Sequence, residues 1–283
     1  MTFLAAKTAP VPREGKGAVA IIGIPFDDTS TFRRGSRHGP SAIRWASQSI
    51  ETYSPVLRRD LEDVELFDGG DVDVAGGGVE GMRSATDAHL ARLPSHAVPA
   101  VLGGEHTVTL PVVERLRRSY SDLAVLQLDA HTDLRDEYEG LAVSHATVMR
   151  RIADLVGLQS VVQIGTRAGT AAEFETVRRS LRFSSHTLSV PPEIWSWLEQ
   201  RPVYVTLDID VVDPSEAPGT GNPEPEGVAA RQLLTFIRML GDLHVVGFDL
   251  VEVSPPYDPS GRTAVLAATI VREAILVISA RPL

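Results

Sequence analysis

The chain has 283 residues, 43% of them apolar, and carries a formal net charge of −10. The length and apolar content suffice to bury one core, and the charge disfavours nucleic acid as a partner while favouring a small cation. The chain contains no cysteine, which excludes disulfide bonds, thiolate metal sites and cysteine nucleophiles.

No linker-like stretch divides the chain, so we expect a single domain at residues 18–283, preceded by an N-terminal tail at residues 1–17. We find no apolar run of 18 residues and no signal-peptide pattern. We therefore expect no membrane partner and a cytoplasmic location.

Seven short runs of β-branched and aliphatic residues predict β-strands. Most of these runs are continuous rather than alternating, which is typical of strands covered on both faces. In chain order they are residues 18–24, 64–67, 98–102, 123–128, 160–164, 203–207 and 245–248.

Helical patterns separate most of these runs, and the alternation predicts a parallel sheet with helices on both sides. Ser41 is interpreted as a helix cap and Thr170 with Glu173 as a capping box, whereas residues 76–78 and 191–192 are interpreted as turns. The predicted helices are residues 42–48, 111–118, 146–155, 229–240 and 263–279.

Acidic residues and histidines follow three of the predicted strands. Residues 129–133 read Asp-Ala-His-Thr-Asp, and residues 208–210 read Asp-Ile-Asp. Alternate residues of an extended chain share one face, and open parallel sheets bind ligands at the carboxyl ends of their strands. These side chains should therefore meet in one cavity and hold two divalent ions. The predicted ligands are His106, Asp129, His131, Asp133, Asp208 and Asp210.

Asp129 and Asp208 would bridge the two ions. The first ion would also bind His106 and Asp133, and the second would also bind His131 and Asp210. Four carboxylates and two imidazoles form an oxygen-rich site, which favours Mn²⁺ over zinc or copper. A pair of ions roughly 3.5–4 Å apart would lower the pKa of a bridging water and generate hydroxide.

Glu252, in the segment Val-Glu-Val-Ser-Pro-Pro, adds one more carboxylate. Four carboxylates cancel two divalent ions, so the hydroxide and Glu252 leave the pocket about two charge units negative. A planar guanidinium fits such a pocket, because a carboxylate can bind it bidentately while hydroxide attacks its central carbon.

These segments together resemble the ureohydrolase family, which contains the arginases and agmatinases. The resemblance implies a three-layer α/β/α fold with an eight-stranded, mostly parallel sheet, assembly into homo-oligomers (trimers or hexamers), and hydrolysis of a guanidino compound to an amine and urea. It rests on residues 103–107, 129–133, 144–147, 208–214 and 217–221, and on Glu252 with its flanking residues.

The resemblance implies the same six metal ligands and assigns Glu252 as the guanidinium-binding residue. It implies that His145 exchanges protons and that Asp133 accepts a hydrogen bond from the hydroxide and relays a proton to the departing amine. His145 is expected to open a helix, whose dipole would disfavour its cationic form. The alternative is that His145 only caps that helix.

The substrate depends on residues outside this shared set. Arginases carry a polar Ser-Gly-Asn loop where this chain has Asp-Glu-Tyr-Glu-Gly at residues 136–140. Asp136 and Glu139 are expected to repel an α-carboxylate and bind a terminal ammonium, as in agmatine or the longer N1-aminopropylagmatine. Arg135, Arg167 and Arg262 could instead pair with a substrate carboxylate, which would favour 4-guanidinobutyrate.

Arginine and guanidine are further alternative substrates, and the family resemblance leaves nickel as an alternative metal, because the family includes relatives that hydrolyse guanidine with nickel. Three positions depart from the family pattern. Glu105 replaces the usual aspartate before the first metal-binding histidine, and Asn222 and Glu226 replace a threonine and a glycine. Asn222 can still donate a hydrogen bond near the guanidinium.

The sequence disfavours three other classes of protein. Dinuclear phosphoesterases need Gly-Asn-His and Gly-His-x-His clusters, which this chain lacks. Metal-dependent deacetylases share the fold but do not keep the run at residues 129–133 together with the His106 segment. A non-catalytic family member would be expected to have lost ligands, and here all six are present.

Overall fold

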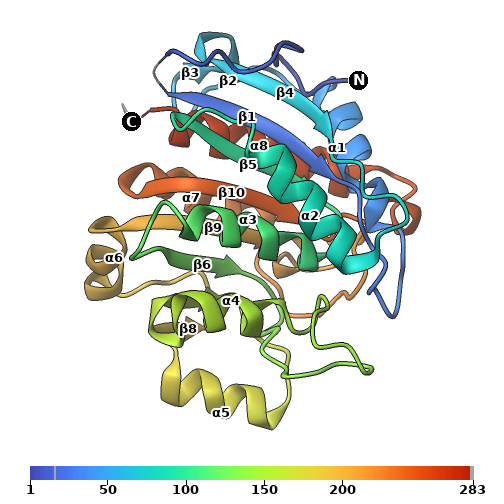
Figure 1. The fold of residues 1–283 in the computed structure, drawn as a ribbon, viewed down its shortest axis with the longest axis vertical. Coiled ribbons are helices and arrows are strands. Elements are labelled where there is room, and N and C mark those ends of the chain that lie inside the picture. The colour runs from blue at the N-terminus through green and yellow to red at the C-terminus, as the bar shows by residue number, and fades with distance from the viewer. Residues whose placement is uncertain (16, 281–283) are drawn as a thin grey trace.

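The computed structural model describes residues 1–15 and 17–280 of the chain. Their main feature is an eight-stranded sheet in the order β4-β1-β5-β10-β9-β6-β7-β8, in which every neighbouring pair is parallel (Figure 1). The strands are β1 (Ala18–Ile24), β4 (Leu66–Asp71), β5 (Ala97–Gly103), β6 (Ala124–Leu128), β7 (Val161–Ile164), β8 (Phe183–Ser185), β9 (Pro202–Asp208) and β10 (His244–Val251).

The seven predicted strands match seven of these within a few residues, because the interior strands are buried along almost their whole length. The prediction from apolar runs missed β8, a half-buried edge strand that reads Phe-Ser-Ser. It also missed a short hairpin of β2 (Tyr53–Ser54) and β3 (Arg59–Asp60). The predicted fold class is confirmed.

Helices cover both faces of the sheet and complete three layers (Figure 1). Side chains of α1, α6, α7 and α8 pack into the core on one face, and those of α2, α3, α4 and α5 into the core on the other. The helices are α1 (Gly39–Ser47), α2 (Gly78–Leu90), α3 (Thr109–Arg117), α4 (Val148–Val156), α5 (Ala171–Ser180), α6 (Pro192–Glu199), α7 (Ala230–Met239) and α8 (Arg262–Ile278).

Three local predictions need correction. Ser41 does not cap α1, because the helix begins two residues earlier and the Ser41 hydroxyl donates to the carbonyl of His38 within that first turn. Gly78 and Pro192, predicted in turns, begin α2 and α6; the fixed φ of proline suits a first helical position. The capping box of Thr170 and Glu173 is confirmed.

The N-terminal segment predicted as a tail lies against the edge of the sheet. Phe3 is 1% exposed, its backbone N–H donates to Asp68 at 2.8 Å, and Lys7 forms a parallel bridge with Phe67. Residue 16 of the predicted tail and residues 281–283 of the predicted domain lie outside the described residues. Within the described part of the chain, no helix is long and apolar enough to cross a membrane.

Candidate active site

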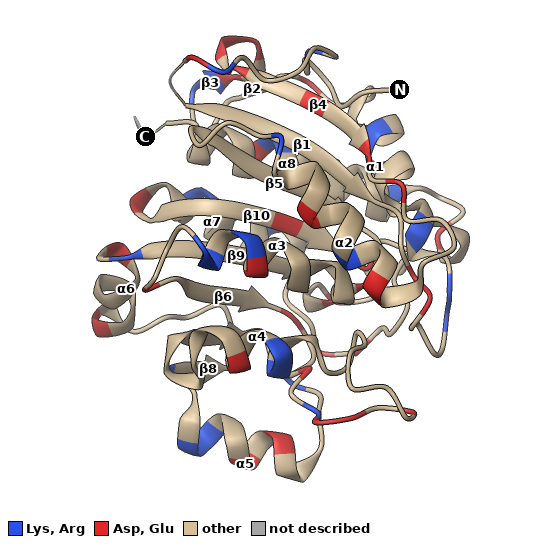
Figure 2. Ribbon diagram, in the orientation of Figure 1, with Lys and Arg blue, Asp and Glu red and all other residues tan. Residues whose placement is uncertain are grey.

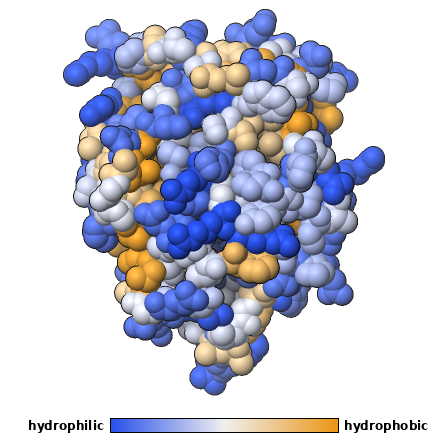
Figure 3. Space-filling model, turned by 90° about the vertical axis from the view of Figure 1, so that its right-hand side faces the viewer, coloured by the Kyte–Doolittle hydropathy of each residue, from blue (hydrophilic) through white to orange (hydrophobic). Residues whose placement is uncertain are grey.

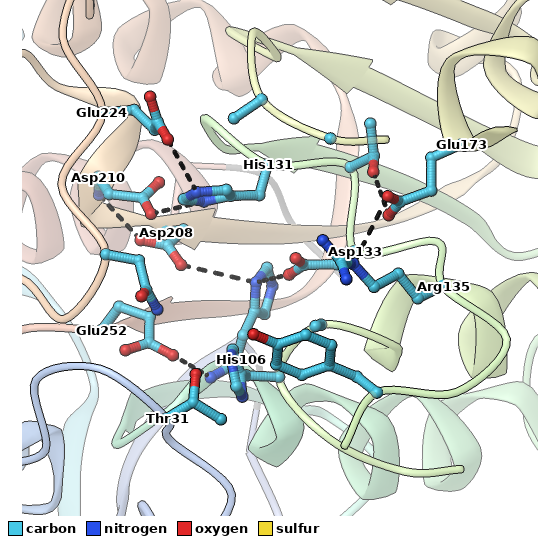
Figure 4. A pocket seen from close by; sticks show the side chains of 17 residues that line it. Thr31, His106, His131, Asp133, Arg135, Glu173, Asp208, Asp210, Glu224 and Glu252 are labelled. Carbon is cyan, nitrogen blue, oxygen red and sulfur yellow. Dashed lines mark hydrogen bonds and ion pairs between the residues drawn. The ribbon is translucent and has the colours of Figure 1, made fainter. Parts of the chain in front are cut away.

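Four adjacent strands, β5, β10, β9 and β6, deliver the predicted site residues to one edge of the sheet. His106 follows β5, Glu252 follows β10, Asp208 ends β9 and Asp129 follows β6. The side chains of His106, Glu252 and Asp208 line a cavity of about 260 Å³ (Figure 4), and Asp129 lies buried beside His106. Acidic segments occupy the loops beyond these strand ends (Figure 2). Because the strands are parallel, their carboxyl ends meet at this edge. Residues more than 100 positions apart in the chain, such as His106 and Glu252, therefore become neighbours.

Two groups of ligand atoms meet in this cavity. In the first, Nδ1 of His106 lies 3.0 Å from Asp129, 3.1 Å from Asp133 and 3.7 Å from Asp208. In the second, Nδ1 of His131 lies 2.9 Å from Asp210 and 3.6 Å from Asp129. All six predicted ligands therefore come together, but Asp129 alone belongs to both groups, whereas Asp208 was predicted as a second bridge.

The donor set fits divalent cations. Nδ1 of His106 is buried and has no hydrogen-bond partner, although carboxylate oxygens surround it. Burial and the neighbouring Asp210 and Asp129 raise the pKa of Asp208 well above its usual value. Such crowding of buried carboxylates is costly without positive charge, and a bound cation would relieve it.

Asp208 and Asp210 are each held through one oxygen and direct the other towards the ligand cluster, whereas Asp129 is held through both oxygens. Oδ1 of Asp208 accepts the N–H of Asp210 at 2.8 Å, and Oδ1 of Asp210 accepts the N–H of Ala130 at 3.1 Å. Asp129 accepts the N–H of His131 at 2.6 Å and the side-chain amide of Gln127 at 2.7 Å. The oxygens Oδ2 of Asp208 and Asp210 remain directed at the two histidines.

The ligands do not converge through extended-chain alternation as predicted. Asp210 lies in a 3-10 turn at Ile209–Val211, which the Asp208 side chain caps. Asp133 has a φ of 51° and Glu252 a φ of 65°, both in the left-handed region. Such backbone costs of order 1–3 kcal/mol per residue and is held here by the surrounding contacts. Tight turns, rather than strands, aim these side chains.

Sequence reasoning missed a buried network behind His106. Its Nε2 lies 2.8 Å from the hydroxyl of Thr206, which donates to Asp249 at 2.6 Å. Asp249 also accepts the hydroxyls of Tyr204 and Thr109 at 2.5 and 2.8 Å. Because the Thr206 hydrogen is used, Nε2 of neutral His106 must donate, which leaves Nδ1 as the ligand atom. Polar residues inside apolar strands were the available signal.

Glu173, predicted only as a capping-box residue, also fixes the loop that carries Asp133. Its Oε1 accepts the hydroxyl of Thr132 at 2.6 Å and the N–H of Leu134 at 3.1 Å. Its Oε2 accepts the N–H and hydroxyl of Thr170, each at 2.8 Å. Glu173 therefore holds the residues on both sides of Asp133.

Glu252 is 5% exposed and lines the cavity beside Asn222 and Thr31. Its Oε1 accepts the backbone N–H of His106 at 2.9 Å. Burial and the charge of Glu105 raise its pKa well above the usual value. A guanidinium placed in the cavity would supply the missing positive charge.

His145 lines the same cavity, but it lies in a turn three residues before α4, so the prediction that it opens the helix is wrong. Its ring packs edge-to-face on Tyr138 with ring centres 5.7 Å apart. Burial and the charge of His131 lower its pKa to about 4. Burial, rather than the predicted helix dipole, is the main factor that disfavours the cationic form of this imidazole.

Comparisons with known proteins agree with this geometry. The model of the arginase family matches residues 17–277. The chain belongs to the arginase family.

Among the relatives, an agmatinase of Bacillus anthracis is 42% identical over 94% of this chain and 93% of its own length. A guanidinobutyrase of Pseudomonas aeruginosa is 33% identical over 92% of this chain and 86% of its own. The crystal structure of an agmatine ureohydrolase from Thermoplasma volcanium superposes with a TM-score of 0.78, at 34% identity over 93% of this chain and 90% of that one. The protein is a ureohydrolase of the agmatinase type.

Two predicted substrate-binding residues of this ureohydrolase do not line the cavity. Asp136 is 77% exposed and pairs with Arg150 at 2.9 Å, and Glu139 is exposed in a tight turn with a φ of 49°. From the same loop, Arg135 and Tyr138 line the cavity instead. Another acidic residue, Glu224, does line the cavity, and its Oε1 lies 3.9 Å from Nε2 of His131 (Figure 4).

The three arginines that could pair with a substrate carboxylate do not lie together in the structure. Arg167 donates to five backbone carbonyls, those of Gly165, Asp210, Val211, Glu224 and Pro225. It therefore fastens the loop that carries Glu224. Arg262 begins α8 away from the cavity lining, and Arg135 stacks on Tyr138 with Nε 3.6 Å from Glu173. Arg167 thus ties together both ends of the segment at residues 210–225.

Metal binding by this arginase-family protein is expected to strengthen as pH rises. In the metal-free protein burial lowers the pKa of His106, but the ion pairs with Asp129 and Asp133 outweigh it and raise the pKa well above the usual value. His106 is therefore protonated at neutral pH and must lose its proton to become a ligand. The apparent affinity for Mn²⁺ should rise up to about tenfold per pH unit for each proton displaced. Calorimetric titration between pH 6 and 9 measures this, and an affinity independent of pH would contradict it.

Proposed function

We propose that this ureohydrolase hydrolyses agmatine to putrescine and urea, a step of polyamine biosynthesis, with two Mn²⁺ ions per subunit. The observation that carries the proposal is the charge of the cavity. Among the described residues that line it, six carry a carboxylate and only Arg135 carries a guanidinium, which is already shared between Tyr138 and Glu173. A substrate with positive charge at both ends suits this lining, whereas one with a carboxylate lacks a free cationic partner.

The metal site would use His106, Asp129, Asp133 and Asp208 for one ion and His131, Asp210 and Asp129 for the other. When bound, the two ions would lower the pKa of a water between them and supply hydroxide near neutral pH. The oxygen-rich ligand set supports Mn²⁺, with nickel as the alternative.

The protein residues then orient the guanidinium and move protons. Glu252, held by the N–H of His106, presents its second oxygen to the guanidinium N–H groups. Gly221 leaves room for it, since a side chain there would begin 3.4 Å from Oε2 of Glu252. Asn222 also lines the cavity. Neutral His145 exchanges protons with the substrate, and Asp133 passes a proton to the departing amine.

We assign the distal ammonium of agmatine to Glu224, in place of Asp136 and Glu139. Glu224 lines the cavity on the wall next to Asn222 and is 41% exposed on its side chain, which leaves a carboxylate able to meet a cation near the cavity mouth. Viewed from the carboxyl ends of the strands, the centre of the molecular face is hydrophilic (Figure 3). A cationic chain could therefore extend outwards past Glu224.

Glu224→Gln is expected to raise KM for agmatine about fivefold with little change in kcat. A partly exposed charge pair contributes about 1 kcal/mol, and the loss falls on binding because the ammonium does not react. Steady-state urea release measures both constants. The matched controls are Asp136→Asn and Glu139→Gln, which should leave KM unchanged. If a control rather than Glu224→Gln raised KM, the loop at residues 136–140 would be the ammonium site.

The substrate itself is tested by urea release from Mn²⁺-loaded protein with agmatine, N1-aminopropylagmatine, arginine, 4-guanidinobutyrate and guanidine side by side. We expect the highest kcat/KM for agmatine or its aminopropyl derivative. A preference for 4-guanidinobutyrate or arginine would overturn the charge argument, and activity on guanidine with nickel alone would replace both substrate and metal.

We further propose a cytoplasmic homo-oligomer, a trimer or hexamer, as the family resemblance implies. Large apolar side chains on the surface, such as Trp45 at 65% and Phe32 at 67% exposure, are candidates for subunit contacts. Light scattering coupled to size-exclusion chromatography measures the assembly, and a monomer at micromolar concentration would contradict the proposal.

A further inference from the structure

Glu105 is a fully buried carboxylate that the catalytic scheme does not use. It immediately precedes His106, yet it does not line the cavity and belongs to neither group of ligand atoms. Its side chain instead points towards the loop after β1, where it meets Thr29 and Ser30. A buried carboxylate needs hydrogen-bond donors of this kind, and one of them, Thr29, also contacts His145 of the cavity.

Glu105 acts as a hydrogen-bond acceptor towards this loop. The N–H of Thr29 lies 3.0 and 3.3 Å from its two oxygens, and the Thr29 hydroxyl donates to Oε1 at 2.5 Å. The hydroxyl of Ser30 donates to Oε2 at 2.9 Å. The single hydrogen of the Thr29 hydroxyl is therefore used on Glu105. The Thr107 hydroxyl, 3.3 Å from that of Thr29, cannot receive the same hydrogen, and it also hydrogen-bonds Glu105.

The Thr29 oxygen consequently faces His145 as an acceptor. It receives the backbone N–H of His145 at 3.1 Å and lies 3.5 Å from ring atom Nδ1. A neutral imidazole carries one hydrogen, and an acceptor beside Nδ1 favours placing it there. Nε2, at the other edge of the ring, then keeps its lone pair available to the cavity that His145 lines.

We propose that Glu105 and Thr29 set the tautomer of His145, holding Nδ1 protonated so that Nε2 accepts the proton during the reaction. Both are positioning residues, because they act through the His145 ring and do not touch the substrate. The catalytic consequence rests on the proposed function of His145 as the proton-exchanging group. The tautomer itself does not.

The test reads the tautomer directly. In metal-free protein labelled with ¹⁵N-histidine at pH 8.5, long-range ¹H–¹⁵N spectra distinguish the two tautomers, and the His145 signals are identified by their loss in His145→Asn. Wild-type protein should show the Nδ1–H form. Glu105→Gln offers an amide donor to Thr29, which frees the Thr29 hydroxyl to donate to Nδ1, so His145 should shift to the Nε2–H form.

Two variants at Thr29 serve as controls if Glu105→Gln does not fold. Thr29→Val keeps the shape but removes the hydroxyl, and should lose the preference for Nδ1–H. Thr29→Ser keeps the hydroxyl and should restore the wild-type tautomer. A wild-type Nε2–H form, or an unchanged Nδ1–H form in both Glu105→Gln and Thr29→Val, would overturn the assignment.

Kinetics separate this inference from the proposed function. In the Mn²⁺-loaded enzyme, variants with the wrong tautomer should lose roughly 10- to 100-fold in kcat with little change in KM, and Thr29→Ser should recover the lost rate. If the tautomer shifts but kcat does not fall, the Glu105–Thr29 assignment stands and the proton-exchanging role of His145 is overturned.

Discussion

Asp129→Asn is expected to remove one or both metal ions and to reduce kcat/KM roughly a thousandfold, since the ions contribute several kcal/mol to catalysis. Asp129 is fully buried and alone belongs to both groups of ligand atoms. One of its oxygens receives the N–H of His131 and the other the amide of Gln127. An asparagine amide would place its NH₂ against one of these donors and could offer a single oxygen to the metals.

The measurement for Asp129→Asn is metal content after dialysis, by mass spectrometry, together with urea release. The matched control is Asp122→Asn, an exposed position before the amino end of the same strand, β6, which should keep wild-type metal content and rate. Two ions per subunit and unimpaired activity in Asp129→Asn would exclude Asp129 as the shared ligand.

Glu252→Gln is expected to reduce kcat/KM for agmatine by about 100- to 1000-fold while metal content stays unchanged. A buried charge-assisted pair that loses one partner costs about 3–4 kcal/mol. The glutamine oxygen can still accept the N–H of His106, so the backbone should stay in place. Its NH₂ would then face the guanidinium donors and repel them. Urea release over a range of agmatine concentrations measures this loss.

The same substitution should raise the melting temperature of the metal-free protein. Burial and the nearby acidic groups raise the pKa of Glu252 well above its usual value. At pH values above the pKa of this carboxyl in the unfolded chain, Glu252 therefore lowers the free energy of unfolding. Neutral glutamine removes that penalty. Lower activity together with a higher melting temperature would show that Glu252 is kept for substrate binding rather than for stability. An unchanged kcat/KM would show that Glu252 does not bind the guanidinium.

Within the fold, the interior strands were predictable because burial on both faces leaves an uninterrupted apolar run, as in β1 and β9. The edge strand β8 was not, since its three residues are only partly buried and Phe-Ser-Ser carries no such pattern. Helix α2 was missed because glycines and a weak apolar stripe obscure its start. Apolar runs therefore predict the buried strands of the core but not the partly exposed elements at the edges of the fold.

Within the site, the clustering of the six proposed ligands was predictable because divalent ions favour particular side chains, and parallel strands deliver these residues to one edge. The direction of surface side chains was not predictable. Asp136 looked like a pocket residue from its place after the ligand run, but its loop turns it towards Arg150. Glu224 reaches the cavity because Arg167 fastens its loop through backbone carbonyls, a contact across 57 residues.

The sequence by itself determined the class of fold, the metal-binding residue types and the family, since these follow from local hydrophobic runs and from motifs a few residues long. Only the tertiary structure decided that Glu224 lines the cavity, that Thr206 and Asp249 lie behind His106, and that Glu105 reaches His145 through Thr29. Each of these contacts joins strand ends or loops far apart in the chain. Their geometry depends on strand order and turn conformation, which local sequence patterns do not encode.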